Sequence, residues 1–328
     1  MTNKLFSAFV ISLLFTACAG RTAAPPVAPQ RTSQTMCNVE NLQKQMQEIA
    51  SVTNGPVGAT TMIVETGEKA SISASHHFPM QSVYKLPIAM AVLKRIDNKT
   101  LTFEDKITVQ PKDFVSRREF SIATKYPKGA DLPIRELLDY MISESDGTAC
   151  DALMRMLGGP EAVTKNLREW GVDDIVLATY EQDMFKSPSV SFQNWSTPEA
   201  MVQLLKLLQT EKVLSAERRD ILLSLMIKSR PGQQRIKGLL APGTTVAHKT
   251  GTSGTNDGVT TATNDVGIIT LPNGRHLAIA VFVSTTTADE KTREAVIAKV
   301  ARAATDCWFE PTKAVVPGAQ ASPPVGSN

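Results

Sequence analysis

The chain has 328 residues, of which 42% are hydrophobic and 20% charged, and its formal net charge is +3. This composition is that of a globular protein with enough length for about two domains. Lys and Arg are interspersed with Asp and Glu, so no basic footprint for nucleic acid stands out, and we expect no nucleic-acid partner.

The first residues have the layout of a secretory signal peptide. Lys4 is followed by an apolar run, 5–17, which is too short to span a bilayer, and then by small residues. Cleavage at the small-x-small sequence Ala17-Cys18-Ala19 competes with a bacterial lipobox that ends at Cys18 and places a lipid there. The Pro/Ala/Thr-rich residues 19–36 favour the lipoprotein, because such a tether holds a folded domain away from a membrane. We therefore expect an exported, periplasmic protein with a lipid anchor at Cys18.

Hydrophobic periodicity predicts the elements that follow. Asn38 caps a first helix, and alternating segments on either side of Gly67 read as strands. The pattern is then helical from Ser82 to about Ser229. Three strands are then predicted at 244–251, 264–271 and 276–284, and a final helix is predicted at 289–307.

This order predicts an α/β plus all-α fold: an antiparallel sheet assembled from both ends of the chain, flanked by the terminal helices, with a helical domain inserted. A site is expected in the cleft between the two lobes. Residues 178–196 show no regular pattern, and loops of this length are usually functional or disordered. The expected boundaries are a signal peptide at 1–18, a flexible linker at 19–36, an α/β domain at 37–80 and 230–309, an all-α domain at 81–229 and a disordered tail at 310–328.

Three cysteines follow Cys18, and an oxidising compartment allows two of them to pair. Cys37 directly precedes the first helix and Cys307 follows the last. If these helices pack antiparallel, the start of one lies beside the end of the other. We therefore predict a Cys37–Cys307 disulfide with Cys150 as a buried free thiol, the alternative being three unpaired cysteines.

Ser82-Val83-Tyr84-Lys85 opens the helical block. Residues i and i+3 share a helix face, so the Lys85 amine can reach the Ser82 hydroxyl. The helix N-terminus adds a partial positive charge and free N–H groups that stabilise an oxyanion near Ser82. A lysine surrounded by other cations loses its proton near neutral pH and can then serve as the base that a nucleophilic serine needs.

Two further motifs are each weak alone. Lys249-Thr250-Gly251 ends a strand, where it offers a substrate carboxylate a cation and a donor and lets a ligand backbone approach at Gly251. The alternative is a strand that leads into a turn. Ser145-Asp146-Gly147 starts a helix, where Ser and Asp ordinarily cap free N–H groups.

Together and in this order, the three motifs resemble the signature set of serine β-lactamases and penicillin-binding proteins. The separations, 63 residues from Ser82 to Ser145 and 104 from Ser145 to Lys249, resemble those of class A β-lactamases. The resemblance covers residues 37–309 and implies hydrolysis of penicillins and cephalosporins. The stretches most similar to the PER- and VEB-type extended-spectrum group are FPMQSVYKL, SFQNWSTPEAM, RIKGLLAPGTTVAHKTGTSG and TATNDVGII.

One acidic residue separates the two families. Class A β-lactamases carry a glutamate about 36 residues after the middle-motif serine, and penicillin-binding proteins lack it. The count from Ser145 reaches Glu181, inside residues 178–196. Hydrolysis of an acyl-enzyme needs a base that activates water, and Glu181 is the candidate.

The resemblance implies a role for each motif residue. Ser82 is the nucleophile, and Lys85, Glu181 through a water, or both, deprotonate it. Ser145 relays a proton to the lactam nitrogen, a step that Lys249 assists.

The remaining implied roles concern substrate binding. Lys249 and Thr250 hold the substrate carboxylate, and the backbone N–H groups of Ser82 and Thr252 form the oxyanion hole. Arg235 matches a guanidinium that some class A enzymes bring to the same carboxylate; the alternative is a surface arginine.

Two positions depart from the family pattern. Gly147 stands where an Asn amide usually bonds the substrate and the catalytic lysine. Phe185 stands where the pattern Glu-x-x-x-Asn places an amide that holds the deacylating water. We expect Gly147 to shift substrate and inhibitor preference without abolishing activity, because one lost hydrogen bond costs about one to a few kcal/mol.

No metal or cofactor is expected, because the histidines show none of the short metal-binding spacings; they are His76, His77, His248 and His276. We expect a monomer that acts on small-molecule β-lactams. Two alternatives stay open. One is a D-alanyl-D-alanine peptidase of the same fold, against which Glu181 argues. The other is a binding protein that is acylated but barely turns over, which Gly147 and Phe185 favour.

Overall fold

The computed structural model describes residues 37–115, 121–184 and 186–309. The expected signal peptide with Cys18, the linker, the tail at 310–328 and Phe185 lie outside the described residues. What is described belongs to one unit, Met36–Asn328. None of the helices within these ranges combines the length and the apolar character needed to cross a membrane.

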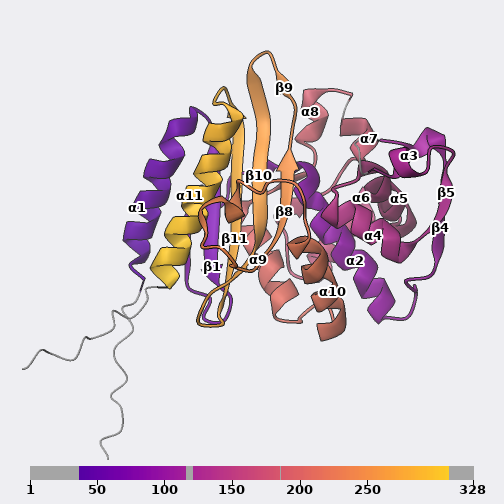
Figure 1. Ribbon diagram of the computed structural model, residues 1–328, viewed down its shortest axis with the longest axis horizontal. Helices are drawn as coiled ribbons and strands as arrows, with labels where there is room; N and C mark the ends of the chain where they lie inside the picture. Colours follow the sequence, from indigo (N-terminus) through magenta and orange to yellow (C-terminus); the bar gives the residue numbers. More distant parts are fainter. Residues whose placement is uncertain (1–36, 116–120, 185, 310–328) are drawn as a thin grey trace, which may run out of the picture. The chain divides into compact units, whose positions relative to one another are not determined.

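An antiparallel sheet built from both ends of the chain lies between two layers of helices (Figure 1). Its strands are β1 (Val57–Ile63), β2 (Lys69–Ile72), β8 (Val246–Thr252), β9 (Thr255–Asn256), β10 (Val259–Thr270) and β11 (His276–Thr286). The order is β2-β1-β11-β10-β8, with β9 paired to β10. Every residue of β1 is buried because both faces of the sheet are covered. The predicted sheet, assembled from both chain ends, is confirmed.

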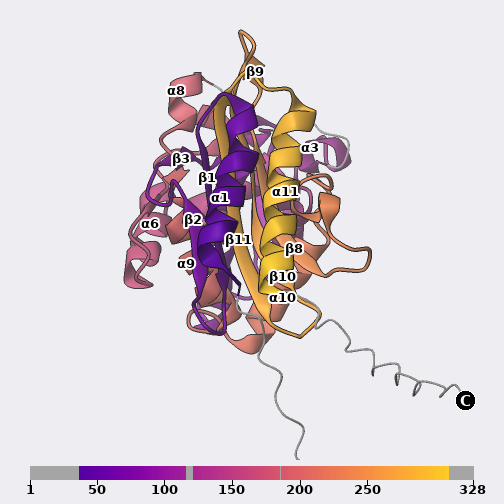
Figure 2. The same ribbon diagram turned by 90° about the vertical axis from the view of Figure 1, so that its left-hand side faces the viewer.

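Two terminal helices, α1 (Val39–Ala50) and α11 (Glu290–Trp308), lie side by side over one face of the sheet (Figures 1 and 2). The first begins as predicted, since Asn38 Oδ1 accepts a hydrogen bond from the backbone N–H of Asn41 at 3.0 Å. Their apolar stripes and the facing strands share one core cluster, which includes Leu42, Met46, Ile63, Val281, Val296, Ile297, Val300 and Ala304.

The antiparallel packing of these helices brings their cysteines together. Cys37 and Cys307 form a disulfide with Cα atoms 4.9 Å apart. Cys150 is a buried free thiol. Both predictions are confirmed.

Replacing Cys37 and Cys307 together by Ser should lower the free energy of unfolding by about 2–5 kcal/mol, because the cross-link joins residues 270 positions apart and restricts the unfolded chain. Urea unfolding of the oxidised wild type and the double variant measures this. Wild type unfolded in reductant is the control and should match the variant. Equal midpoints for all three samples would contradict the expectation.

Helices from the middle of the chain cover the other face of the sheet (Figure 1). The longest of them begins at Lys85 and is buried from there through Leu93. The α-helices are α2 (Lys85–Asp97), α3 (Ile122–Lys125), α4 (Ile134–Ser143), α5 (Gly147–Leu157), α6 (Pro160–Glu169), α7 (Glu181–Met184), α8 (Pro188–Ser191), α9 (Pro198–Gln209) and α10 (Ala216–Ile227). Of these, α9 packs on β1 and β11, and α10 packs on β8. The 3₁₀ turns are η1 (Ser51–Thr53), η2 (Gln81–Tyr84), η3 (Pro111–Asp113) and η4 (Ile236–Leu239).

The segment 178–196 contains regular structure that its sequence pattern does not predict. It holds α7, α8 and β7 (Trp195–Ser196). These elements are one turn or two residues long, so hydrophobic periodicity cannot reveal them. β7 pairs with β6 (Ile175–Val176) and with β3 (Phe78–Pro79), and this small sheet brings the segment beside the residues that precede Ser82. A further short pair, β4 (Lys106–Val109) and β5 (Ala130–Pro133), lies in the helical block.

Candidate active site

Ser82 lies in the 3₁₀ turn η2, directly before α2, and not in the first turn of an α-helix as predicted. Its side chain is partly exposed, whereas the Lys85 side chain is fully buried. Lys85 Nζ donates a hydrogen bond to Ser82 Oγ at 2.7 Å. The predicted contact therefore forms, and the 3₁₀ turn favours it because three residues per turn place i and i+3 in line. A serine hydroxyl against a buried amine is the arrangement of an activated nucleophile.

The turn that carries Ser82 is held against two strands of the main sheet, β10 and β8. Asn264 on β10 donates through Nδ2 to the carbonyl oxygens of Pro79 and Met80, at 2.8 and 3.1 Å. Gly251 on β8 packs against the same backbone, and a Cβ there would lie 2.3 Å from the Met80 carbonyl oxygen. The sequence predicts that a ligand backbone approaches Gly251. On the side where the Cβ of another residue would lie, the backbone of Met80 occupies that place instead.

Ser145 is not the helix cap that its position suggests. Asp146 caps α5, because its Oδ1 accepts from the backbone N–H of Ala149 at 2.9 Å. Its Oδ2 accepts from the backbone N–H of Ile122, the first residue of α3, at 3.0 Å. Burial raises the pKa of Asp146, and these hydrogen bonds oppose the rise. Ser145 adopts φ +60°, a conformation that costs a non-glycine residue free energy and occurs often at functional sites.

The Lys249 amine is fully buried between two oxygens. It donates to Ser145 Oγ at 2.9 Å and to the Thr250 carbonyl oxygen at 3.1 Å. The first contact joins the second and third motifs, which lie 104 residues apart in the sequence. The Thr250 side chain is also buried.

Glu181 begins α7, and its carboxylate reaches the Ser82 turn. Its Oε2 forms an ion pair with Lys85 Nζ and accepts a hydrogen bond from the Tyr84 hydroxyl at 2.7 Å. Burial raises the pKa of Glu181, but the Lys85 ammonium and the hydrogen bonds from Lys85 and Tyr84 together hold that pKa below its usual value of 4.5. The carboxylate is therefore ionised at neutral pH, as a general base must be. The charged group in contact with Lys85 is an anion, whereas the sequence predicts surrounding cations.

Gly147, the first residue of α5, leaves space that Glu181 occupies. A Cβ at this position would lie 2.9 Å from Glu181 Oε1 and 2.9 Å from Val115 Cγ1. Contacts shorter than 3.0 Å are essentially never made by a real Cβ, so a side chain here requires Glu181 to move. The absence of a side chain at Gly147 therefore allows the Glu181 carboxylate to lie where it does.

Asp151 holds the backbone at Glu181. Its two carboxylate oxygens accept from the backbone N–H groups of Glu181 and Gln182, at 2.8 and 3.0 Å. The side chain is completely buried. Burial raises the pKa of Asp151 from 3.8 to about 6, and the two backbone hydrogen bonds oppose this rise.

Asp151 should make the protein less stable as the pH rises from about 4 to about 6. The folded state holds its proton up to about pH 6 and the unfolded state only to about 3.8, so folded protein binds more protons in this window. The expected fall in unfolding free energy is about 3 kcal/mol, since one pKa unit corresponds to about 1.4 kcal/mol. Asp151→Asn should remove this part of the pH dependence.

Urea unfolding of wild type and Asp151→Asn at several pH values measures the effect. Asn accepts one backbone hydrogen bond fewer than Asp151, which lowers the free energy of unfolding by an amount that does not depend on pH. The slope of the unfolding free energy against pH is therefore compared between the two proteins, and not its absolute value. Parallel curves for the two proteins would contradict the assignment.

Arg235 is buried, so it is not the surface arginine of the alternative reading. Its Nε pairs with Glu294 Oε1 at 3.0 Å, and Nη1 donates to the carbonyl oxygens of Gly251 and Asn264. Nη2 donates to the Thr252 hydroxyl at 2.8 Å. Four of the five guanidinium donors are thus engaged within the protein, and the side chain joins β8, which carries Lys249 and Thr252, to β10, which carries Asn264.

Several residues of this site carry no role in the sequence prediction, and they are Tyr84, Asp151, Asn264, His248 and Asp265. The last two are fully buried on neighbouring strands, with His248 Nδ1 2.9 Å from Asp265 Oδ2. Tyr84 stands inside the first motif, and Asn264 and Asp265 stand inside TATNDVGII. His248 stands inside RIKGLLAPGTTVAHKTGTSG, directly before Lys249. The sequence thus contained a signal for these four residues, but each of them contacts another segment of the chain, and no spacing rule predicts such contacts.

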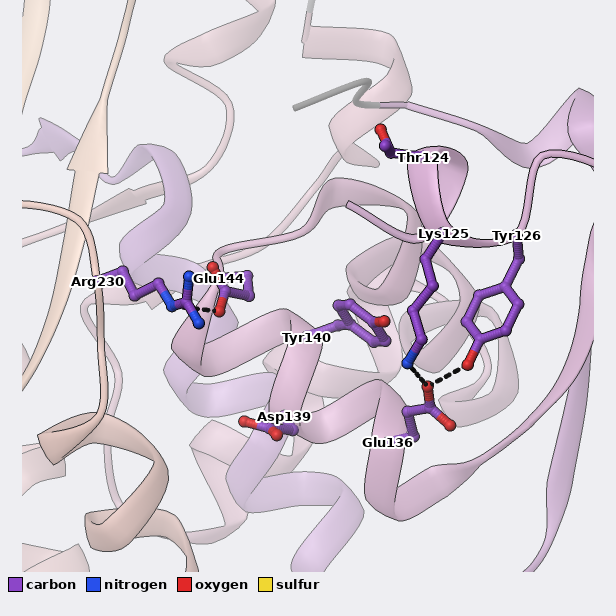
Figure 3. A pocket seen from close by; sticks show the side chains of 8 residues that line it. All are labelled: Thr124, Lys125, Tyr126, Glu136, Asp139, Tyr140, Glu144 and Arg230. Atoms are coloured by element: carbon purple, nitrogen blue, oxygen red, sulfur yellow. Dashed lines mark hydrogen bonds and ion pairs between the residues drawn. The ribbon is translucent and has the colours of Figure 1, made fainter. Parts of the chain in front are cut away.

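A surface cavity of about 640 Å³ is lined in part by Glu144, the residue before Ser145 (Figure 3). Two ion pairs lie in its wall. Glu136 Oε1 accepts from Lys125 Nζ at 3.1 Å and also from the Tyr126 hydroxyl at 2.7 Å. Arg230 pairs with Glu144 at 2.8 Å. No motif residue lines this cavity. The Glu136 triad (Glu136, Lys125 and Tyr126) repeats the contacts of Glu181 with Lys85 and Tyr84 at a partly exposed site, so it provides matched controls.

Comparison with known proteins identifies the family. The model of the β-lactamase enzyme family matches residues 41–308. The chain is 38% identical over 265 residues to β-lactamase VEB-1 of Pseudomonas aeruginosa, covering 80% of this chain and 89% of that protein. It is 36% identical over 264 residues to the extended-spectrum β-lactamase PER-1 of the same organism, covering 80% and 86%.

A solved structure agrees. The β-lactamase of Chitinophaga pinensis is 42% identical, with a TM-score of 0.79 and coverage of 81% of this chain and 98% of that one. The resemblance to the PER and VEB group, and the fold that it implies, are confirmed. With Ser82, Lys85, Ser145, Glu181 and Lys249 gathered in one place, the chain belongs to the β-lactamase enzyme family, as a class A enzyme.

Proposed function

We propose that the protein hydrolyses the β-lactam amide bond of penicillins and cephalosporins through an acyl-enzyme on Ser82, and so confers antibiotic resistance. The observation that carries this proposal is the contact series Ser82 Oγ, Lys85 Nζ and Glu181 Oε2. It connects the nucleophile to a carboxylate that is ionised at neutral pH, which hydrolysis of an acyl-enzyme needs and a peptidase of the same fold lacks. The names of VEB-1 and PER-1 support the same activity.

In this mechanism Ser82 Oγ attacks the lactam carbonyl. The proton leaves through Lys85, through Glu181 with a water, or through both, and the contact between the two groups gives each of them access. Ser145, in contact with Lys249 Nζ, passes a proton to the lactam nitrogen as the amide bond breaks. Glu181 then takes a proton from the water that attacks the acyl carbon.

Substrate binding is assigned to the end of β8. Lys249 and Thr250 attract the substrate carboxylate, and Gly251 keeps the Ser82 turn against the strand. The backbone N–H groups of Ser82 and Thr252 stabilise the oxyanion. Arg235 supports this binding through its hydrogen bond to the Thr252 hydroxyl.

Intact-mass spectrometry during incubation with a chromogenic cephalosporin tests the proposal. Fast turnover without a lasting adduct is the expected result. A persistent adduct on Ser82 with negligible hydrolysis would instead identify a binding protein or peptidase. The extended-spectrum name of PER-1 leads us to propose hydrolysis of extended-spectrum cephalosporins as well, which kinetics on such substrates check.

We also propose an exported, periplasmic monomer, anchored by a lipid at Cys18, with the α/β domain at 37–80 and 230–309 and the helical domain at 81–229. The apolar run at 5–17 and the Pro/Ala/Thr-rich stretch after it support export and anchoring. The mass of the mature N-terminus distinguishes lipidation from plain cleavage. Native mass spectrometry checks the oligomeric state.

A further inference from the structure

Tyr84 stands between Ser82 and Lys85 and has no role in the mechanism so far. Its side chain is fully buried, and its hydroxyl donates to Glu181 Oε2 at 2.7 Å. The same oxygen contacts Lys85 Nζ. Two donors on one oxygen fix the carboxylate, while Oε1 faces the space at Gly147.

The tyrosine hydroxyl is a permanent donor in this position. Burial raises the pKa of Tyr84 well above its usual value of 10, and the neighbouring Cys150, Glu181 and Asp151 groups raise it further. Tyr84 therefore keeps its proton at neutral pH, and it does not compete with Glu181 as a base. Its effect on the carboxylate is to hold it and to favour its ionised form.

The sequence lacks the two amide side chains that the family pattern places around the acid, since Gly147 and Phe185 occupy their positions. Within the described residues, the side chains that donate to Glu181 are those of Tyr84 and Lys85. Lys85 also contacts Ser82, so its proton is part of the reaction. Tyr84 is the donor that can hold Glu181 unchanged through the whole cycle.

We propose that Tyr84 is a positioning residue for deacylation: its hydroxyl holds Glu181 Oε2 so that Oε1 is aimed at the attacking water. In that step the water oxygen bonds to the acyl carbon and its proton passes to Glu181 Oε1. The bond between the acyl carbon and Ser82 Oγ breaks, and the proton returns to Ser82 Oγ. The inference rests on the proposed function, and wild-type turnover tests that function separately.

The test is Tyr84→Phe, which removes one oxygen and keeps the ring. Deacylation should slow by about tenfold, because a hydrogen bond to a charged group is lost. The acid limb of the kcat profile should move to higher pH, because a contact that lowers the pKa of Glu181 is gone. The fraction of protein that carries an adduct on Ser82 at steady state should rise, as measured by rapid quench and intact mass.

Tyr126→Phe is the matched control, since this hydroxyl also donates to a glutamate at 2.7 Å, in the Glu136 triad. It should leave turnover, adduct level and pH profile at wild-type values. If wild type turns over and Tyr84→Phe equals it in all three measurements, the inference is overturned and the proposed function stands. If wild type itself does not turn over, the proposed function fails.

A second measurement applies if Tyr84→Phe does not fold. Replacing the four tyrosines of the chain biosynthetically by 3-fluorotyrosine makes each hydroxyl a stronger donor and keeps the ring. The acid limb of kcat should then move to lower pH, in the wild-type background and in Tyr126→Phe alike. An acid limb that does not move overturns the inference.

Discussion

Glu181→Gln should convert the protein from one that releases its product into one that stays acylated on Ser82. The amide keeps the size of the side chain but cannot take a proton from water, so deacylation should fall by about 10²- to 10⁴-fold. Acylation continues to the extent that Lys85 alone deprotonates Ser82. Intact-mass spectrometry after mixing with a cephalosporin measures the lifetime of the adduct, and the burst of released chromophore measures acylation.

The substitution also removes the counter-charge of a fully buried lysine, so stability has to be measured beside activity. Glu136→Gln is the control, because this glutamate also contacts a lysine and a tyrosine but lies in a partly exposed triad away from Ser82. It should turn over as wild type does. Fast, adduct-free turnover by folded Glu181→Gln would show that another group activates the water.

Gly147→Asn should slow hydrolysis although it restores the residue that the family pattern has at this position. The new Cβ would lie 2.9 Å from Glu181 Oε1, and Val115 Cγ1 is equally close, so the acid has to move. The carboxylate has to retreat by about half an ångström to reach ordinary contact, and since a displacement of about 1 Å at a reacting group can cost about a hundredfold in rate, the expected cost is about tenfold. We expect a loss of that order in kcat, with unequal effects on a penicillin and a cephalosporin, as steady-state kinetics on both measure.

Gly171→Asn provides the comparison for this substitution. A Cβ at Gly171 meets nothing within 4 Å, and Asn tolerates its positive φ of 76° better than most residues do. Its kinetics should equal those of wild type. Gly147→Asn with unchanged or improved kcat on both substrates would mean that Glu181 has free space that the packing at Gly147 does not indicate.

The parts of this molecule that follow from local pattern were predicted from the sequence. Asn38 caps the first helix, and the strands near Gly67 and after residue 244 pair as expected. The Cys37–Cys307 disulfide followed from the antiparallel packing of two amphipathic helices. Spacing also predicted the contact between Lys85 and Ser82, because three residues are one turn.

What the sequence did not predict depends on contacts between distant segments. The 3₁₀ turn at Ser82 exists because Asn264 and Gly251 hold its backbone. The helix α7 forms on the two backbone hydrogen bonds to Asp151, and it is too short for its own sequence to specify it. From the sequence alone, Tyr84 is interpreted as an ordinary aromatic residue of the core. Its hydrogen bond to Glu181 is visible only in the folded structure. The roles of such residues follow from the side chains and backbone groups that they contact, and these contacts are known only once the fold is known.

The pairing of β1 with β11 has a consequence for how the chain folds. A strand that ends at Ile63 has to remain without this partner until residues 276–286 have been synthesised. Pairings this distant in sequence are slow to form, so the central sheet is completed late, after synthesis of nearly the whole chain. Ser82 and Ser145 leave the ribosome before Asn264, which holds the backbone that precedes Ser82, and Lys249, which contacts Ser145. A chain that is interrupted before β10 therefore carries the nucleophile and the acid, but it lacks Asn264, which holds the backbone before Ser82, and the strand that pairs with β8.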